Sequence, residues 1–144
     1  MLGAIPSDLY SARIQHTRTG MLVLMTTSDK STSSGVVVHL DEAEPDKHAS
    51  VLRNIGNLLD ALDDGTHIEL VVHGPGLTAA LTDAPHAARL RELLSRGVSV
   101  AACANTMREK KISVDGLIDG VHVVPSGVAE LVRRQREGWA YIRP

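Results

Sequence analysis

The chain has 144 residues, of which 43% are hydrophobic and 22% charged, and its formal net charge is −2. This size and balance predict one domain with a sizeable buried core, and they exclude a strongly basic protein that would bind a polyanion. With one tryptophan, two tyrosines and no phenylalanine, the chain lacks the aromatic platforms on which single-stranded nucleic acids stack, so we expect no nucleic-acid partner.

The single cysteine and the short apolar runs narrow the class of protein further. One cysteine cannot form an internal disulfide or a cysteine-rich metal site, and it fits a reducing cytoplasm. The longest early apolar run, 21–25, is too short for the core of a signal peptide. No run approaches the roughly 20 residues of a membrane span, so we expect a cytoplasmic protein without a membrane partner.

Residues 1–34 differ in composition from the rest of the chain. They mix glycine, serine and threonine with isolated charges and end in the serine-rich stretch 28–34. Such a segment buries little apolar surface, so we expect a flexible N-terminal arm with no assigned function. Residues 35–144 are predicted to form a single domain.

From residue 35 onward, short apolar runs alternate with amphipathic stretches. The apolar runs predict five strands, at 36–40, 68–73, 98–102, 121–124 and 139–142. The amphipathic stretches predict helices from Pro45 to about 63, within 77–96, from about 105 to 111, and after an N-cap at Ser126. Strands that alternate with helices indicate an α/β sandwich with a mostly parallel sheet.

Cys103 lies where the third predicted strand passes into a helix. The thiolate is the reactive form of cysteine, and its pKa falls when a helix N-terminus or nearby cations stabilise it. The stretch 104–111 offers both, because it contains Arg108, Lys110 and Lys111. The alternative is a small buried cysteine that completes a strand, since free cysteine is among the most buried residue types. The pattern alone leaves both interpretations open.

Two further loops follow predicted strands and can hold a ligand. His73 can act as a proton donor, an acceptor or a thiolate partner, and Gly74 and Gly76 allow a backbone to approach a ligand closely. Ser126 and Gly127 open the last helix, whose N–H groups can bind an anion. The structural alternatives are a tight turn and a simple helix cap. The carboxyl ends of strands are nonetheless the edge where open α/β sheets bind ligands.

Patterns typical of metal and cofactor sites are missing from the sequence. Seven histidines are present, including His39, which ends the first strand with Asp41. No histidine pair has a recognisable zinc spacing with acidic partners, so we expect no metal site. The glycines after His73 complete neither a dinucleotide fingerprint nor a Walker A loop, and no nucleophile elbow is present. We therefore expect no cofactor.

Several stretches taken together resemble the DsrE/DsrF-like family of small α/β proteins, which includes sulfur-relay and YchN-like members. The resemblance covers about 35–144, and the order and spacing of the motifs make it specific. The matching stretches are Val37-Val38-His39-Leu40-Asp41-Glu42, Leu52 to Leu59, Glu69-Leu70-Val71-Val72-His73-Gly74-Pro75-Gly76, Gly97-Val98 with Cys103-Ala104-Asn105-Thr106-Met107, Val124 to Val128, and Gly138 to Pro144.

The resemblance implies a three-layer α/β/α sandwich with a five-stranded parallel sheet and helices on both faces. It also implies a homotrimer or homohexamer. In such a fold the second and third strands are neighbours, which places His73 and Gly74 beside Cys103. In sulfur-relay members a cysteine after the Gly-Val strand carries a persulfide, and Cys103 occupies the corresponding place.

The leading hypothesis is a sulfur carrier or sulfurtransferase-like protein that uses Cys103 with His73 and exchanges sulfur with donor and acceptor proteins. The first rival is a non-catalytic oligomeric protein that binds a small molecule or anion, with Cys103 merely structural. The second rival is an oligomeric scaffold, in which Trp139 and Tyr141 help to assemble subunits. The candidate ligand-binding residues are Gly74, Gly76, Asn105, Thr106, Ser126 and Gly127.

Overall fold

The computed structural model describes residues 34–144, so the predicted N-terminal arm lies, except for Ser34, outside the described residues. Strands and helices alternate along this part of the chain, as predicted. In chain order the elements are β1 (Gly35–Leu40), α1 (Pro45–Ala61), β2 (His67–Val72), η2 (Gly74–Ala80), α2 (Ala87–Ser95), β3 (Ser99–Cys103), α3 (Ala104–Lys110), η3 (Val114–Gly116), β4 (His122–Val124), α4 (Gly127–Arg136) and β5 (Ala140–Ile142).

The strands form a five-stranded sheet with the order β4-β3-β2-β1-β5. All four pairings are parallel, and β2 lies beside β3 with Val71 opposite Ala101. The last strand returns to the first, where Tyr141 pairs with Val37. The predicted five-stranded parallel sheet and the predicted neighbourhood of the second and third strands are therefore confirmed.

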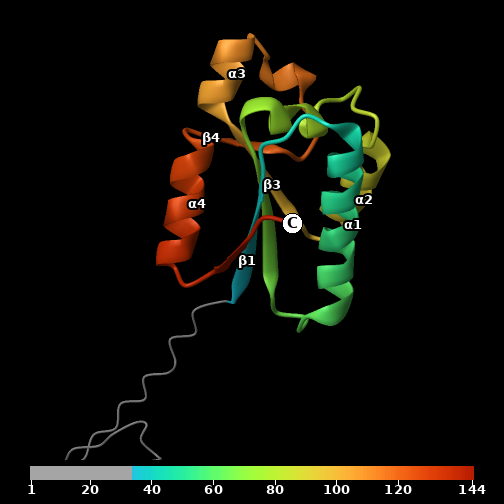
Figure 1. Cartoon of the computed structure of the whole chain (residues 1–144), viewed down its shortest axis with the longest axis vertical. Helices are drawn as coiled ribbons and strands as arrows, with labels where there is room; N and C mark the ends of the chain where they lie inside the picture. The colour runs from blue at the N-terminus through green and yellow to red at the C-terminus, as the bar shows by residue number, and fades with distance from the viewer. Residues whose placement is uncertain (1–33) are drawn as a thin grey trace, which may run out of the picture. The chain divides into compact units, whose positions relative to one another are not determined.

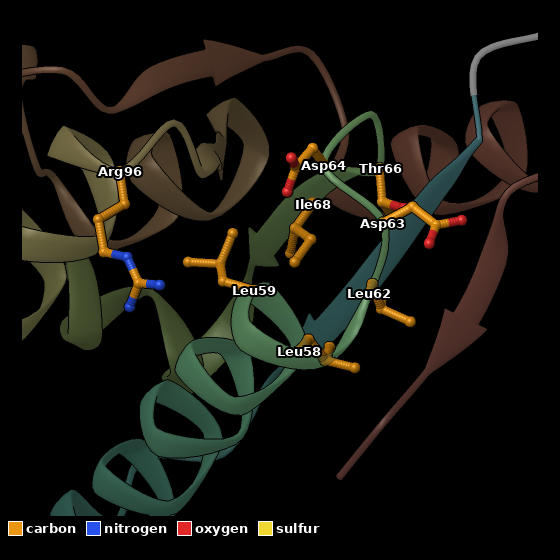
Figure 2. A pocket seen from close by; sticks show the side chains of 8 residues that line it. All are labelled: Leu58, Leu59, Leu62, Asp63, Asp64, Thr66, Ile68 and Arg96. Carbon is orange, nitrogen blue, oxygen red and sulfur yellow. The ribbon is translucent and has the colours of Figure 1, made fainter.

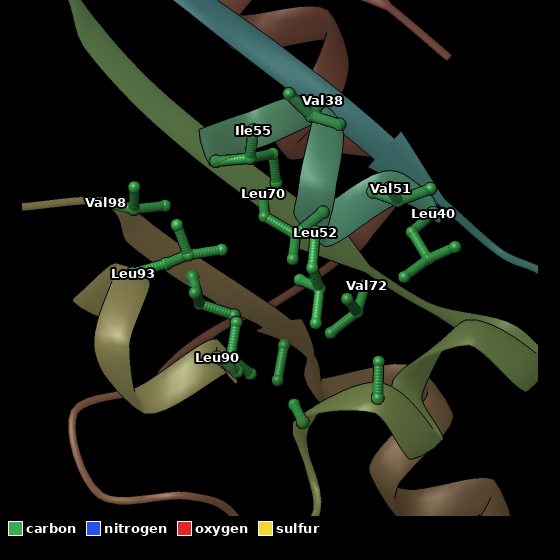
Figure 3. Close-up of a cluster of buried hydrophobic side chains, with 14 of the residues drawn as sticks. Val38, Leu40, Val51, Leu52, Ile55, Leu70, Val72, Leu90, Leu93 and Val98 are labelled. Atoms are coloured by element: carbon green, nitrogen blue, oxygen red, sulfur yellow. The ribbon is translucent and has the colours of Figure 1, made fainter. Parts of the chain in front are cut away.

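Helices cover both faces of the sheet, so the predicted three-layer α/β/α architecture is confirmed (Figure 1). The helices α1 and α2 lie on one face, and α4 lies on the other. Figure 3 shows the main core between the sheet and the first pair of helices. It is aliphatic, and its labelled members from the strands alternate along each strand. Those ten labelled side chains are Val38, Leu40, Val51, Leu52, Ile55, Leu70, Val72, Leu90, Leu93 and Val98.

The face under α4 holds a smaller apolar cluster, Val37, Val71, Ala101, Val124 and Leu131. It also holds a buried ion-pair network that the sequence interpretation overlooked. The side chain of Glu69, in the middle of β2, is 0% exposed, and Arg134 of α4 donates from Nε to its Oε1 at 2.7 Å. Burial raises the pKa of Glu69 to about 7, although the hydrogen bond from Arg134 opposes that shift.

Two helix starts follow from the residues at their first turns. Pro45 occupies the first turn of α1, where its fixed φ suits the helix and no N–H is missed. Ser126 caps α4, because its Oγ accepts the N–H of Ala129 at 3.1 Å. Both expectations from the sequence are confirmed.

The segment between β2 and β3 differs from its prediction. The helical pattern expected within 77–96 divides into the 3-10 helix η2 and the shorter helix α2. Pro85 lies between them and disfavours a helical conformation at the preceding residue, which accounts for the break. The predicted turn after His73 is also the first turn of η2. Cys103, expected just beyond the third strand, is the last residue of β3 and pairs with Val124.

Within residues 34–144, every helix is too short or too polar to cross a lipid bilayer.

Candidate functional site

The carboxyl ends of β1, β2 and β3 bring three candidate residues to one edge of the sheet. Val37, Val71 and Ala101 face α4, and residues two positions further along a strand point to the same side. His39, His73 and Cys103 therefore belong to the α4 side at the edge where the strands end. The register supports this placement, because continuing it beyond Val72 and Ala102 sets His73 beside Cys103.

Backbone N–H groups and one hydroxyl lie near enough to the sulfur of Cys103 to influence its pKa. Burial of the thiol raises its pKa, but the backbone N–H groups of Gly127, Thr106 and Asn105 and the hydroxyl of Thr106 all stabilise the thiolate. Their combined effect places the pKa of Cys103 below its ordinary value. Chemically, the arrangement increases the share of the thiolate, which is the nucleophilic form, relative to an ordinary cysteine.

The cations expected beside the sulfur have other positions. Arg108 donates to Oδ1 of Asn105, and the side chains of Lys110 and Lys111 are exposed. The groups that lower the pKa of Cys103 are hydrogen-bond donors of the backbone and of Thr106. The expectation of a cationic surrounding is therefore corrected, because α3 turns its charged side chains toward solvent.

Thr106 links the loop after β2 to the sulfur. Its Oγ1 accepts the N–H of Gly74 at 2.8 Å, and the same hydroxyl donates toward Cys103. Gly74 has a φ of +55°, a conformation that glycine adopts without strain. Of the two glycines predicted to bind a ligand, Gly74 thus supports the thiolate through Thr106.

The remaining predicted ligand-binding residues have structural contacts. A Cβ on Gly76 would lie 2.3 Å from the carbonyl oxygen of Leu40, so this glycine permits close packing on the end of β1. Ser126 is occupied as the cap of α4. Gly127 packs between the two central candidates, because its Cβ would lie 2.9 Å from Cβ of His73 and 3.2 Å from Cβ of Cys103.

His73 lies close to Cys103 across Gly127, but its Nε2 is directed at another histidine. The Nε2 atoms of His73 and His39 are 2.7 Å apart, and the rings stack with centroids 4.8 Å apart. His39 also meets Tyr141, whose hydroxyl lies 2.7 Å from Nδ1. Burial and the neighbouring His73 lower the pKa of His39, while Asp41 opposes that shift.

His39 and Tyr141 were not among the site residues predicted from the sequence. The signal for His39 is that it ends a strand next to a carboxylate, as His73 ends the following strand. Ligand atoms of His39, Asp41 and His73 all lie within 4.8 Å of one another, a grouping that can hold a metal ion. The expectation of no metal site rested on spacing along the sequence, which does not report residues on adjacent strands.

The site is nearly closed around the sulfur. Cys103 is 5% exposed and Thr106 is 6% exposed. A hollow of about 220 Å³ lies elsewhere, where α1 ends and β2 begins (Figure 2). Its lining includes Ile68, near the start of β2, so it is at the opposite end of the strand from His73. It is not part of the candidate site.

Comparisons with known proteins place the chain in a family. The model of the DsrE/DsrF-like family matches residues 35–144. The protein of unknown function MTH1491 from Methanobacterium thermoautotrophicum is similar in structure, with 40% identity, a TM-score of 0.74, and coverage of 77% of this chain and 99% of that chain. The search of curated proteins found no match to this chain.

Two more distant structures share the fold. The YchN protein from E. coli is 18% identical, with a TM-score of 0.59 and coverage of 76% of this chain and 99% of that one. The protein of unknown function BT1422 from Bacteroides thetaiotaomicron is 14% identical, with a TM-score of 0.66 and coverage of 80% and 98%. From the family match and the 40% identity with MTH1491, the chain belongs to the DsrE/DsrF-like family.

Proposed function

We propose that this protein is a sulfur carrier, with sulfurtransferase-like chemistry, that holds sulfane sulfur as a persulfide on Cys103. The observation that carries the proposal is the set of donors around the sulfur: three backbone N–H groups and the hydroxyl of Thr106. They stabilise negative charge on Sγ in spite of burial. A low thiol pKa is what transfer between thiols requires at neutral pH.

The transfer is a pair of balanced displacements. The Cys103 thiolate attacks the outer sulfur of a donor persulfide, the donor S–S bond breaks, and the donor leaves as a thiolate. Cys103 then carries the extra sulfur, with the terminal sulfur anionic. An acceptor thiolate attacks that terminal sulfur and releases the Cys103 thiolate. The chemistry exchanges one S–S bond for another, so it calls for no cofactor.

The surrounding residues have separate roles in this proposal. The N–H groups of Asn105, Thr106 and Gly127 hold the sulfur that becomes the leaving thiolate in the second step. The hydroxyl of Thr106 adds a fourth donor and is itself fixed by Gly74. His73, on the other side of Gly127, is positioned to take part in proton movements near the persulfide through its bond with His39.

Burial sets a condition on the proposal. Because Cys103 is 5% exposed, a donor persulfide must approach along a narrow path at the sheet edge or after a small movement of the residues around it. Such restricted access slows exchange with bulky thiols, while a small persulfide or a fitted segment of a docked protein can still reach the sulfur.

Partners and assembly also belong to the proposal. Sulfur donor and acceptor proteins are required by the chemistry, and a reducing compartment such as the cytoplasm would keep a lone thiol available. A homotrimer or homohexamer is proposed as the working form. Its support is a set of apolar side chains exposed on β4 and α4, Val123, Val128 and Val132. Sedimentation of the purified full chain measures the assembly directly, and a monomer would contradict it.

The alternative function, non-catalytic binding of a small molecule or anion by the strand-exit loops, has weaker support. The N–H of Gly74 already donates to Thr106, and the hydroxyl of Ser126 already caps α4. A ligand would have to replace these internal hydrogen bonds. The remaining donors point at the sulfur, which favours the carrier.

The decisive experiment is to incubate the full chain with glutathione persulfide and measure intact mass. We expect one added sulfur atom, released again by a small excess of an acceptor thiol. Because Cys103 is the sole cysteine in the sequence, Cys103→Ser removes every thiol and should gain no sulfur. A folded wild-type protein that neither gains sulfur nor reacts with iodoacetamide would overturn the proposal.

Thr106 provides a graded test of the mechanism. Thr106→Val removes the hydroxyl donor, so the pKa of the Cys103 thiol should rise and its alkylation at neutral pH should slow severalfold. Thr106→Ser keeps the hydroxyl and is the matched control, with a rate close to that of the wild type. The thiolate absorbance in the ultraviolet, followed against pH, reports the shift independently of access.

A further inference from the structure

The ends of β1 and β2 present two imidazoles and a carboxylate that the proposed sulfur chemistry does not fully use. Nε2 of His39 lies 2.7 Å from Nε2 of His73 and 3.9 Å from Oδ2 of Asp41. One ligand atom from each of the three residues falls within 4.8 Å of the others. Two nitrogens and one oxygen therefore converge on a single point at the carboxyl edge of the sheet.

The orientation of the His39 ring matches what a metal ligand needs. Nδ1 of His39 is engaged by the hydroxyl of Tyr141 at 2.7 Å, which leaves Nε2 as the nitrogen that faces His73. Histidines that bind metals almost always have the second ring nitrogen held by a hydrogen-bond partner, which fixes the ring and its tautomer. Tyr141 supplies that partner from β5, on the other side of β1.

The two carboxylate oxygens of Asp41 face different partners. Its Oδ1 accepts from Arg143 at 2.7 Å, and its Oδ2 is the oxygen that faces His39. Glu42 also accepts from Arg143, at 2.9 Å. The two carboxylates outweigh the one guanidinium, so a dication at the convergence point would meet net negative charge from its neighbours.

The site is open enough for an ion to enter. The side chains of His39 and Asp41 are 12% and 29% exposed. Both side chains therefore keep contact with solvent, whereas Cys103 is buried.

We infer that His39, Asp41 and His73 form a binding site for a divalent transition-metal ion of the zinc type. Two imidazoles with a carboxylate are ligands that Zn²⁺ accepts at about 2.0–2.2 Å, usually in a tetrahedral arrangement. Tetrahedral ligands at those lengths are about 3.3 Å apart, so the two Nε2 atoms must separate by about 0.6 Å and Oδ2 of Asp41 must move closer to His39. The fourth position is open to water.

Without the ion, the same residues form a hydrogen-bonded histidine pair. In that state one Nε2 carries a proton and donates it to the other, which acts as the acceptor. Binding the ion moves this proton from Nε2 to Nδ1 of the same ring, because both Nε2 atoms must offer lone pairs to the metal. The ion therefore replaces the hydrogen bond between the two rings.

The test is calorimetric titration of the reduced full chain with Zn²⁺, followed by titration with Co²⁺ in the visible spectrum. We expect one tight equivalent and a Co²⁺ spectrum of four-coordinate type. His39→Gln, Asp41→Asn and His73→Gln should each weaken Zn²⁺ binding by at least about tenfold. Circular dichroism must show that these variants remain folded.

Three more variants keep the outcome decisive. His86→Gln changes a histidine that starts α2 and has no side-chain cap bond, so it should bind like the wild type. Cys103→Ser should also bind like the wild type, because the thiol is outside the ligand set. Tyr141→Phe removes the hydroxyl that holds His39 and should weaken binding about tenfold or more.

Three results would overturn the inference. The first is wild-type protein that binds no Zn²⁺ above the level of its His39→Gln variant. The second is binding that disappears in Cys103→Ser, together with a sulfur-to-Co²⁺ charge-transfer band, since the thiol would then be the ligand. The third is equal loss in His86→Gln, which would indicate unspecific binding. Sulfur loading of metal-free protein is measured separately, so the two proposals fail independently.

Discussion

The two faces of the sheet share the same central strands but bury different groups. Toward α1 and α2, the strands contribute an aliphatic core of Val, Leu and Ile side chains. Toward α4, the same strands contribute fewer apolar side chains, the buried carboxylate of Glu69, and then His39, His73 and Cys103 at the edge. Burial of apolar area is the main source of stability. The contrast therefore indicates that the aliphatic face supplies most of the stability of the sheet. The α4 face can then hold polar groups that contribute less to stability.

The largest expected change in the free energy of unfolding comes from a substitution in the aliphatic face. Leu70 is 0% exposed in the middle of β2, and Leu70→Ala should lower the free energy of unfolding by about 2–5 kcal/mol, through lost burial and a residual cavity. Urea titration measures the change. Val114→Ala, at a side chain that is 65% exposed and outside the proposed subunit contact, is the control and should stay within about 0.5 kcal/mol. Equal losses in the two variants would mean that burial on the aliphatic face does not determine stability.

A smaller loss of stability is expected where the α4 face meets the sulfur. The Cβ of Gly127→Ala would lie 2.9 Å from Cβ of His73, and such overpacking costs about 1–3 kcal/mol. The displaced N–H should also raise the pKa of the Cys103 thiol, measured by alkylation rate against pH. Gly65→Ala is the matched control, since nothing lies within 4 Å of its added Cβ. An unchanged thiol pKa in folded Gly127→Ala would show that the N–H of Gly127 does not stabilise the thiolate.

The buried carboxylate predicts a pH dependence that the aliphatic face lacks. Burial raises the pKa of Glu69 from 4.5 to about 7. Between these two values the carboxyl is protonated in the folded protein and ionised in the unfolded chain. Stability from this group is complete below about pH 4.5 and is lost as pH rises to about 7. Relative to wild type, Glu69→Gln should therefore gain stability across that window, by on the order of 1 kcal/mol.

The groups that face Glu69 provide the control for this pH prediction. They are Glu130 and Arg134 from α4 and His122 from β4. Burial raises the pKa of Glu130, but the hydrogen bonds with Glu69 and Arg133 have the larger combined effect and hold this pKa below its ordinary value. Glu130→Gln should therefore show the opposite slope, with the wild-type advantage disappearing in acid. Parallel slopes for the two variants in thermal unfolding against pH would refute the assignment.

The smallest expected effect lies at the edge of the α4 face. Tyr141 is 40% exposed, and Tyr141→Phe removes one hydrogen bond, so the free energy of unfolding should fall by less than about 1 kcal/mol. Chemical denaturation measures it, with the fold of the variant checked by circular dichroism. A loss above about 2 kcal/mol would mean that this edge stabilises the domain as strongly as the aliphatic face.

The sequence predicts the aliphatic face better than the α4 face. Runs such as 36–40 and the apolar spacing of 51–62 identify strands and helices through local periodicity, and Ser126 identifies a cap through local hydrogen bonding. Cys103 was identified because its strand-end position is also local. These features depend on neighbours in the chain, which the sequence displays directly.

The missed features depend on which strands lie side by side. His39 meets His73 because β1 pairs with β2, and it meets Tyr141 because the last strand returns to the other side of β1. Neither pairing follows from spacing along the chain. Glu69 lies within an apolar run, and a carboxylate within a buried strand signals a buried partner such as Arg134. A charged residue in such a run therefore indicates an ionic partner on the element packed against it.

The return of β5 to β1 has a consequence for motion at the site. Tyr141 and His39 are 102 positions apart in the chain, and β5 is a three-residue strand at one edge of the described sheet. Pairings of such long sequence separation close a large loop and form slowly, and short edge strands open first in the native state. Amide hydrogens of 140–142 should therefore exchange faster than those of 68–72 in β2. Each opening event would release the His39 ring, so the fraying of this strand would set how often the edge of the site rearranges.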